Sequence, residues 1–277
     1  LGANAYVGSS SGKFTQVTGF RYKTGRSLLK TTDTDAEYDP NFIDLQTYMT
    51  YQLAPKWEIN FLGNLAINNY KFIPHTRETS FKVFMSGQER DKFETLFGAL
   101  TLKHNLNDNT ELGLQASAFT SKEEEGYDIA GDYWLGDAAE EGGGEIQKLS
   151  IARYNEHARN RLHSNIMNVG HYGVARIKNN TLKWGATVQL EKINDKIREW
   201  EKRDSAGYSL PQGGGNVNVI ANLFSDNKLE STRISGYLQD VFKFRTKQGL
   251  FTLVGGVRGS YWSYNREFIF SPRASIG

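Results

Sequence analysis

Hydrophobic and polar residues alternate along several segments of the chain. In residues 181–191 the even-numbered positions are apolar and most odd-numbered ones are polar, and a similar period of two recurs in residues 43–53, 57–68 and 251–261. A period of two over about ten residues is typical of a strand with one apolar and one wet face. The pattern therefore predicts an all-β chain.

The connections between the predicted strands alternate between short and long. Short turns with Asn, Asp, Pro or Gly are predicted at residues 53–56, 106–109, 178–180 and 245–249. Long polar connections are predicted at 24–40, 69–95, 121–163 and 198–228. The strands between them are predicted at 14–23, 41–53, 57–69, 97–106, 110–120, 164–178, 181–197, 229–245, 249–266 and 270–277.

This sorting of connections by length is typical of one fold class. In an outer-membrane barrel the periplasmic turns are short and the external loops are long. We therefore predict an antiparallel transmembrane β-barrel domain over residues 1–277, with the four long connections as extracellular loops. The polar positions of its strands are predicted to face the barrel lumen, and they include Asp44, Gln46, Lys183, Gln189 and Glu191.

Aromatic residues recur beside the short turns, and the ordinary alternative is that they belong to a core. A membrane barrel instead carries a girdle of aromatic side chains at each interface. We expect such a girdle from Tyr51, Trp57, Trp184, Phe242, Phe244 and Phe251.

The amino-acid composition excludes several other classes of protein. The formal net charge is +2 and no basic stripe is visible, so nothing indicates a nucleic-acid partner. The chain has no cysteine, which excludes a disulfide scaffold and a thiolate metal site. No segment approaches the roughly 18 apolar residues of a membrane helix. We expect about ten strands of a larger barrel, part of a longer protein, because the long connections exceed what a small barrel usually supports.

Three short motifs resemble a known family. They are residues 14–22 followed by 42–47, residues 237–240 leading into Phe242 and Phe244, and Ser271-Pro272-Arg273. In this order they resemble the barrel of TonB-dependent outer-membrane receptors of the Bacteroidota type. The resemblance implies a barrel of about 22 strands filled by an N-terminal plug, with a TonB box outside this sequence.

The resemblance also implies a function and partners. It implies import of a siderophore, cobalamin, glycan or peptide driven by the TonB complex, in contact with outer-membrane lipid. A surface lipoprotein partner is left open. No catalytic residue, metal or cofactor is expected, since import breaks no bond.

The segment 121–163 holds the richest set of candidate binding residues. Its first half is acidic with interspersed aromatic residues, and its second half is basic. Aromatic rings among carboxylates suit a sugar or a cationic ligand, whereas the ordinary alternative is a solvated loop whose halves attract each other. The candidates are Tyr127, Asp128, Tyr133, Trp134, Arg159 and Arg161.

A second candidate group lies in residues 198–208. Trp200, Arg203 and Tyr208 have the chemistry to clamp a ligand or a lipid headgroup, or simply to pack a loop. The glycine runs at 142–144 and 213–215 lack the Lys-Ser/Thr that a phosphate loop requires, so they indicate loops.

Other functions remain as alternatives. The first is a passive outer-membrane porin or adhesin barrel without TonB coupling. The others are an outer-membrane enzyme, for which residue spacing gives no support, and a soluble β-sandwich that binds a ligand.

Overall fold

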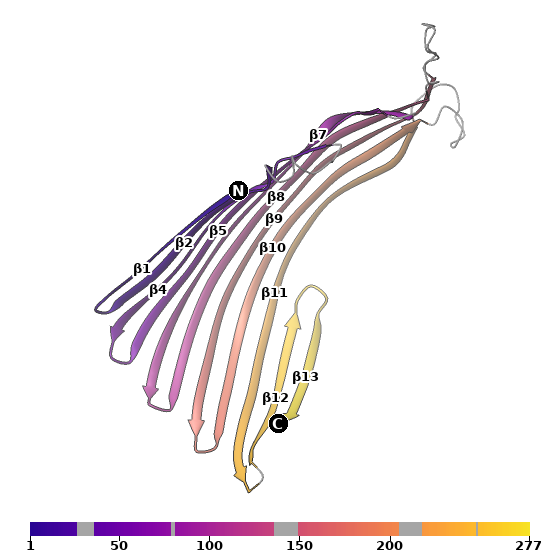
Figure 1. Ribbon diagram of the computed structural model, residues 1–277. Helices are drawn as coiled ribbons and strands as arrows, with labels where there is room; N and C mark the ends of the chain where they lie inside the picture. Colours follow the sequence, from indigo (N-terminus) through magenta and orange to yellow (C-terminus); the bar gives the residue numbers. More distant parts are fainter. Residues whose placement is uncertain (27–35, 79–80, 136–148, 205–217, 248) are drawn as a thin grey trace.

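The computed structural model describes residues 1–26, 36–78, 81–135, 149–204, 218–247 and 249–277, which form a single antiparallel sheet (Figure 1). Its thirteen strands are β1 Gly2–Ser11, β2 Phe14–Thr24, β3 Ala36–Tyr38, β4 Asn41–Ala54, β5 Trp57–Pro74, β6 Arg77–Glu78, β7 Phe81–Asn107, β8 Thr110–Leu135, β9 Leu149–Ile177, β10 Asn180–Asp204, β11 Asn218–Thr246, β12 Gly249–Trp262 and β13 Glu267–Ile276.

The sheet is a meander. The main path runs from β1 to β13 in chain order, with the short strands β3 and β6 paired beside it to β5 and β7. Tight turns join β1 to β2, β4 to β5, β7 to β8, β9 to β10 and β11 to β12, and they gather at one end of the sheet (Figure 1). Gly12 adopts a positive φ of 56° in the first of these turns, a conformation that favours glycine.

The pairing register gives the sheet two chemically different faces. One row crosses nine strands with apolar side chains almost throughout: Met49, Phe61, Leu100, Ala116, Val169, Val188, Ile234, Tyr261 and Phe268. The next row, on the opposite face, is polar or glycine: Thr50, Asn60, Thr101, Gln115, Gly170, Thr187, Ser235 and Ser260. We call these the apolar face and the polar face.

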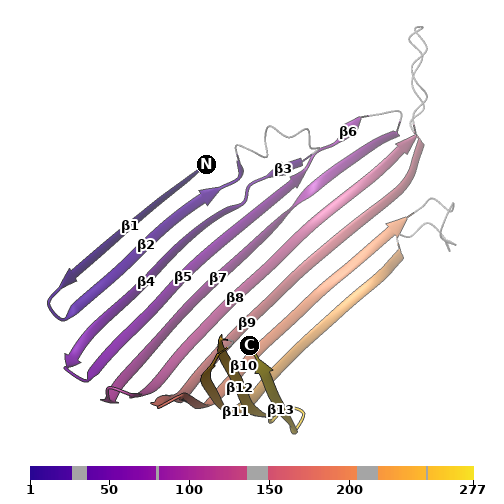
Figure 2. The ribbon, with the colours of Figure 1, turned by 60° about the horizontal axis from the view of Figure 1, so that its bottom comes forward.

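Exposure is the reverse of that in a water-soluble sandwich. On the apolar face Val188 and Leu190 are 43% and 52% exposed, whereas the intervening Gln189 is half-buried. On the polar face Asn60 and Ser121 are only 4% and 6% exposed. Side chains crowd on the inner side of a curved sheet, so the polar face is the concave one. Figure 2 shows the curvature, with β12 and β13 turned out of the plane of the other strands.

Hydrogen bonds hold the polar side chains of the concave face. Arg21 Nε donates to Asp44 Oδ2 at 2.6 Å, between β2 and β4. Ser231 Oγ donates to Glu191 Oε2 at 2.6 Å and accepts from Trp262 Nε1 at 3.0 Å, linking β10, β11 and β12. Many groups of the polar face are therefore joined between neighbouring strands, whereas Asn60 Oδ1 and Nδ2 and Arg233 Nε are buried there without a hydrogen-bond partner.

Aromatic rings lie on the apolar face next to the tight turns. Trp57 stacks on His104 with ring centroids 3.9 Å apart, beside the turn between β4 and β5. Phe244 stacks on both Phe242 and Phe251 at 5.5 Å, beside the turn between β11 and β12. Trp184 lies deeper in the sheet and donates a hydrogen bond to His171 Nε2 at 3.2 Å.

The prediction of an antiparallel all-β fold with four short turns is confirmed, and the ten predicted strands correspond to β2, β4, β5 and β7 to β13. The residue pattern did not predict β1, β3 or β6. β7 to β11 are 25 to 29 residues long, so the predicted starts of β7, β9 and β11 were too late and the predicted ends of β8 and β10 too early.

Much of three predicted loops is therefore strand. β7 and β8 cover residues 81–95 and 121–135, β9 covers 149–163, and β10 and β11 cover 198–204 and 218–228. Of the predicted loop 24–40, residues 27–35 lie outside the described part of the chain. These strand halves carry polar residues on both faces, so the two-residue alternation that predicts strands is missing from them.

The sheet is not closed. β1 pairs only with β2 and β13 only with β12, so the described sheet has two open edges. Within the described residues, no helix is both long enough and apolar enough to cross a membrane.

The open edges and the exposed apolar face generate a prediction about the isolated chain. Without detergent it should not form a monodisperse monomer, because unpaired edges and apolar surface favour association. Light scattering after size-exclusion chromatography, with and without detergent, measures this. A monomeric, cooperatively melting species in plain buffer would contradict the apolar face as described.

Candidate functional site

The predicted binding residues lie on strands rather than in loops. Tyr127, Asp128, Tyr133 and Trp134 are in β8, Arg159 and Arg161 are in β9, and Trp200 and Arg203 are in β10. Tyr208 and the two glycine runs lie outside the described residues. The prediction of a loop environment for the eight described residues was wrong, because β8, β9 and β10 continue through these positions.

The register divides these residues between the two faces. Asp128, Trp134, Arg159, Arg161 and Trp200 lie on the continuation of the apolar face. Tyr127, Tyr133 and Arg203 lie on the continuation of the polar face. They therefore do not form one binding pocket.

Asp128 is the centre of the group on the apolar face. Its Oδ1 lies 2.5 Å from His157 Nδ1, and its Oδ2 accepts a hydrogen bond from Arg159. The His157 ring stacks on Trp200 with centroids 5.0 Å apart, and Lys202 Nζ lies 5.0 Å from the centre of the Trp200 ring. Partial burial opposes ionisation of Asp128, but hydrogen bonds from Arg159 and His157 outweigh it and lower the pKa of Asp128.

A zone of charged residues begins where the apolar rows end. We call residues 89–94, 122–127, 158–163, 194–199 and 223–228 the charged zone; they lie side by side on β7 to β11. On the face that continues the apolar face, its cations are Arg90, Lys92, Lys122, Arg159, Arg161, Lys196, Arg198 and Lys228 and its acids are Glu94, Glu124 and Asp226.

The concave side of the charged zone has the opposite charge. It carries no lysine or arginine within these ranges, and its acids are Glu89, Asp91, Glu123, Glu125, Asp195 and Glu199. Charges of one sign on a concave surface focus the electrostatic potential there. The acidic side therefore attracts cations and cationic ligands.

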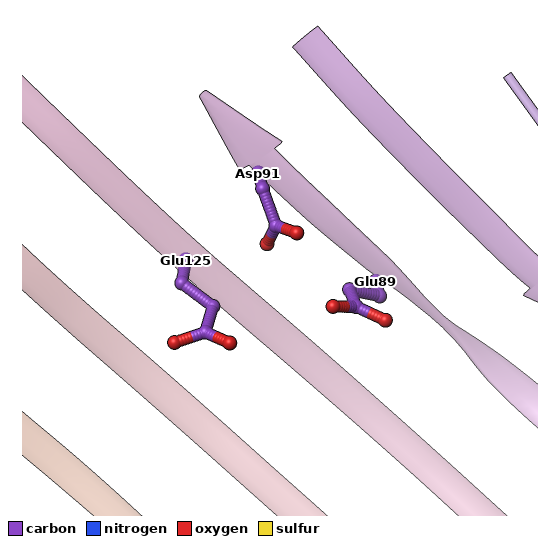
Figure 3. Close-up of side chains that lie close together, drawn as sticks. All are labelled: Glu89, Asp91 and Glu125. Carbon is purple, nitrogen blue, oxygen red and sulfur yellow. The ribbon is translucent and has the colours of Figure 1, made fainter. Parts of the chain in front are cut away.

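Three of these acids form a close group. Glu89 and Asp91 of β7 and Glu125 of β8 each offer a carboxylate oxygen, and these oxygens lie within 4.8 Å of one another (Figure 3). Asn160 Nδ2 donates to Glu125 Oε2 at 2.9 Å and to Glu199 Oε1 at 2.6 Å, which extends the group to β10. Carboxylate oxygens at this spacing have the chemistry to hold a hard divalent cation.

The environment of these acids favours their protonated forms. Partial burial, the neighbouring carboxylates of Asp91 and Glu125 and a hydrogen bond with Asp91 raise the pKa of Glu89 to about 7. Burial also raises the pKa of Asp91, with repulsion from Glu125 adding to the effect. Tyr127 stands in the same acidic surroundings, and burial together with Glu199, Glu156, Glu125 and Glu89 raises its pKa.

Glu89 and Asp91 were not among the binding residues predicted from the sequence. Both fall within the predicted loop 69–95, and their closeness to Glu125 depends on the pairing of Asp91 with Glu125 across β7 and β8. The available signal was the order of charges in Glu89-Arg90-Asp91-Lys92, which alternates in sign with the period of a strand.

The five residues predicted to face a lumen share one face. Asp44, Gln46, Lys183, Gln189 and Glu191 all lie on the polar face. Glu191 accepts hydrogen bonds from Gln189, Ser231 and Trp262, so it joins three neighbouring polar groups on that surface.

No protein-family model matches the chain, and a search of curated proteins finds no similar sequence. The pattern of faces, charges and strand lengths therefore carries the functional conclusion.

The raised pKa of Glu89 predicts a pH effect on local stability. The pKa of Glu89 is higher in the folded than in the unfolded chain. This part of the sheet is therefore at its full stability below pH of about 4.5, where Glu89 is protonated in both states, and it loses stability as the pH rises towards about 7. In full-length protein, hydrogen exchange of the β7 and β8 amides around it, corrected for intrinsic rates, should increase by several-fold over this range. Glu89→Gln should reduce that increase, whereas Glu123→Gln should leave it as it is. An equal increase of hydrogen exchange with pH in both variants would contradict the role of Glu89 in this pH effect.

Proposed function

We propose that this chain is part of an outer-membrane β-barrel receptor that imports a nutrient ligand by TonB-coupled transport. The ligand class is a siderophore, cobalamin, a glycan or a peptide. The single observation that supports membrane insertion best is the continuous apolar face, exposed on the convex side of a sheet whose concave side is polar.

The length of the apolar face fits a bilayer. On β10 it extends from Leu182 to Leu190, and on β5 from Trp57 to Ile67, which is nine and eleven residues of strand. A tilted strand crosses the hydrocarbon layer with about 9–11 residues. The apolar rows end on β7 at Leu96, and the next residue on that face is Glu94, the first of the charged zone.

The two ends of the sheet differ in the way an outer-membrane barrel requires. Tight turns and stacked aromatic rings occupy one end, which suits the periplasmic interface. At the other end the strands continue well past the apolar rows, which suits the extracellular side. A barrel wall that continues outward provides a vestibule for a ligand before it reaches the lumen.

The open edges support a larger barrel. Backbone groups in lipid must be paired, so the edges of β1 and β13 require further strands. The order of the motifs around Phe20, Asp240 and Pro272 resembles that in TonB-dependent receptors, and TonB coupling is proposed on that resemblance. The polar face and the acidic concave side of the charged zone are equally compatible with a passive barrel. Dependence of uptake on energy therefore distinguishes a TonB-coupled importer from a passive pore.

A pair of arginine substitutions tests which face meets lipid. Ala186→Arg, in the middle of the apolar rows on β10, should destabilise the full-length protein in lipid vesicles by about 2–4 kcal/mol. Thr187→Arg, its neighbour on the polar face, should cost far less. Denaturant unfolding in vesicles measures both. Equal costs, or a greater cost at Thr187, would mean that the apolar face is not the lipid-facing one.

Energy dependence tests the transport proposal. Cells that express the full-length protein are given radiolabelled ferric siderophore, cobalamin, oligosaccharide or peptide. One of these should accumulate, and accumulation should stop when the proton gradient is collapsed or TonB is removed. Uptake that continues without TonB would identify a passive pore instead.

A further inference from the structure

The cations of the charged zone lie directly beyond the apolar rows on the same convex face. We call Arg90, Lys92, Lys122, Arg159, Arg161, Lys196, Arg198 and Lys228 the cationic belt. On β7 Lys92, the first cation of the belt, lies four positions beyond Leu96, the last apolar residue. That is about 13 Å along a strand and about 9 Å along the membrane normal at a tilt of 45°. The belt thus begins at the level of lipid headgroups.

The acids on this face do not balance the belt. Lys92 pairs with Glu94 at 2.7 Å, Lys196 with Asp226 at 3.0 Å and Arg161 with Glu124 at 3.9 Å. Within the described part of the chain, Arg90, Lys122, Arg198 and Lys228 have no ion pair within 4.0 Å. Arg161 and Lys196 are direct cross-strand partners, and like charges in that position repel each other. A bound anion would remove this repulsion.

Two adjoining hollows lie among these side chains. One of about 390 Å³ is lined by Arg159, Arg161, Lys196 and Arg198 together with Asp226. A second of about 510 Å³ shares Arg161 and Lys196 with it and adds Lys192 and Lys228 beside Glu230. Arginine guanidinium groups bind phosphate oxygens in pairs, and lysine supplies a further point charge. The hollows thus offer several cations to a phosphate group from β9 and β10 together.

We infer that the cationic belt binds the phosphate groups of a phosphorylated lipid in the outer leaflet of the bilayer. The inference rests on the proposed function, because it requires the apolar face to be in lipid. The cationic belt lies next to the apolar rows, which favours a lipid over a free anion as the ligand. Acyl chains pack on the apolar rows while the phosphates contact Arg161, Lys196 and Arg198. The concave side at the same height repels anions, so binding is confined to the outside of the sheet.

The test uses the full-length protein in phosphatidylcholine vesicles with and without about 20% of a bisphosphorylated lipid, diphosphoryl lipid A. After extraction in mild detergent, native mass spectrometry counts the diphosphoryl lipid A molecules retained. The combined variant Arg161→Gln, Lys196→Gln and Arg198→Gln should retain about tenfold to hundredfold less. Its matched control, Lys103→Gln, Arg258→Gln and Arg273→Gln, removes the same charge from the polar face and should retain as much as the unaltered protein.

Four outcomes would overturn the inference. Equal retention by the two combined variants would show that the belt is not the binding surface. Displacement of the lipid by millimolar inorganic phosphate would show a site for free phosphate. A protein that inserts and folds in phosphatidylcholine alone but retains no diphosphoryl lipid would refute the belt and leave the proposed function standing, whereas failure to insert in either vesicle would refute both.

Discussion

Backbone pairing without a second layer is the constraint on which the rest of this structure depends. Neighbouring strands satisfy each other's N–H and C=O groups from β1 to β13, yet the described residues provide nothing that covers the apolar side chains on the convex face. In water such a face drives association. In a bilayer it is the required surface, since lipid offers no hydrogen-bonding partner to the backbone and accepts apolar side chains. The same apolar face is therefore unfavourable in water and favourable in lipid.

The two-residue period of a strand lets one sheet present different chemistry to its two sides at every height. Across the apolar rows it separates Val188 and Ile234 from Thr187 and Ser235. In the charged zone it separates Arg161 and Lys196 from Glu125 and Glu199, so that opposite charges stand back to back through the sheet. Neither arrangement needs a loop or a second domain, because adjacent residues of a strand already point to opposite sides.

The sequence predicted the part of the fold in which apolar and polar residues alternate. It placed the tight turns after Ala54, Asn107 and Ile177, and it assigned Gln189 and Glu191 to the polar face. It did not predict the outer halves of β7 to β11. In Glu123-Glu124-Glu125 both faces are polar and glutamate has low strand propensity, so only cross-strand backbone pairing reveals the strand. The cluster of carboxylates from Glu89, Asp91 and Glu125 depends on that register, so it could not be predicted from the sequence alone.

The length of the strands has a mechanical consequence. β9 has 29 residues, and in the proposed membrane orientation about eleven of them would cross the hydrocarbon layer. The remaining residues, at about 3.3 Å per residue and a tilt of 45°, would then raise the sheet by about 40 Å above the bilayer. A paired sheet of this height is far stiffer than loops of the same composition. The first encounter with any molecule arriving from outside would then take place on a rigid funnel held clear of the lipid, and orientation would be imposed before the channel is reached.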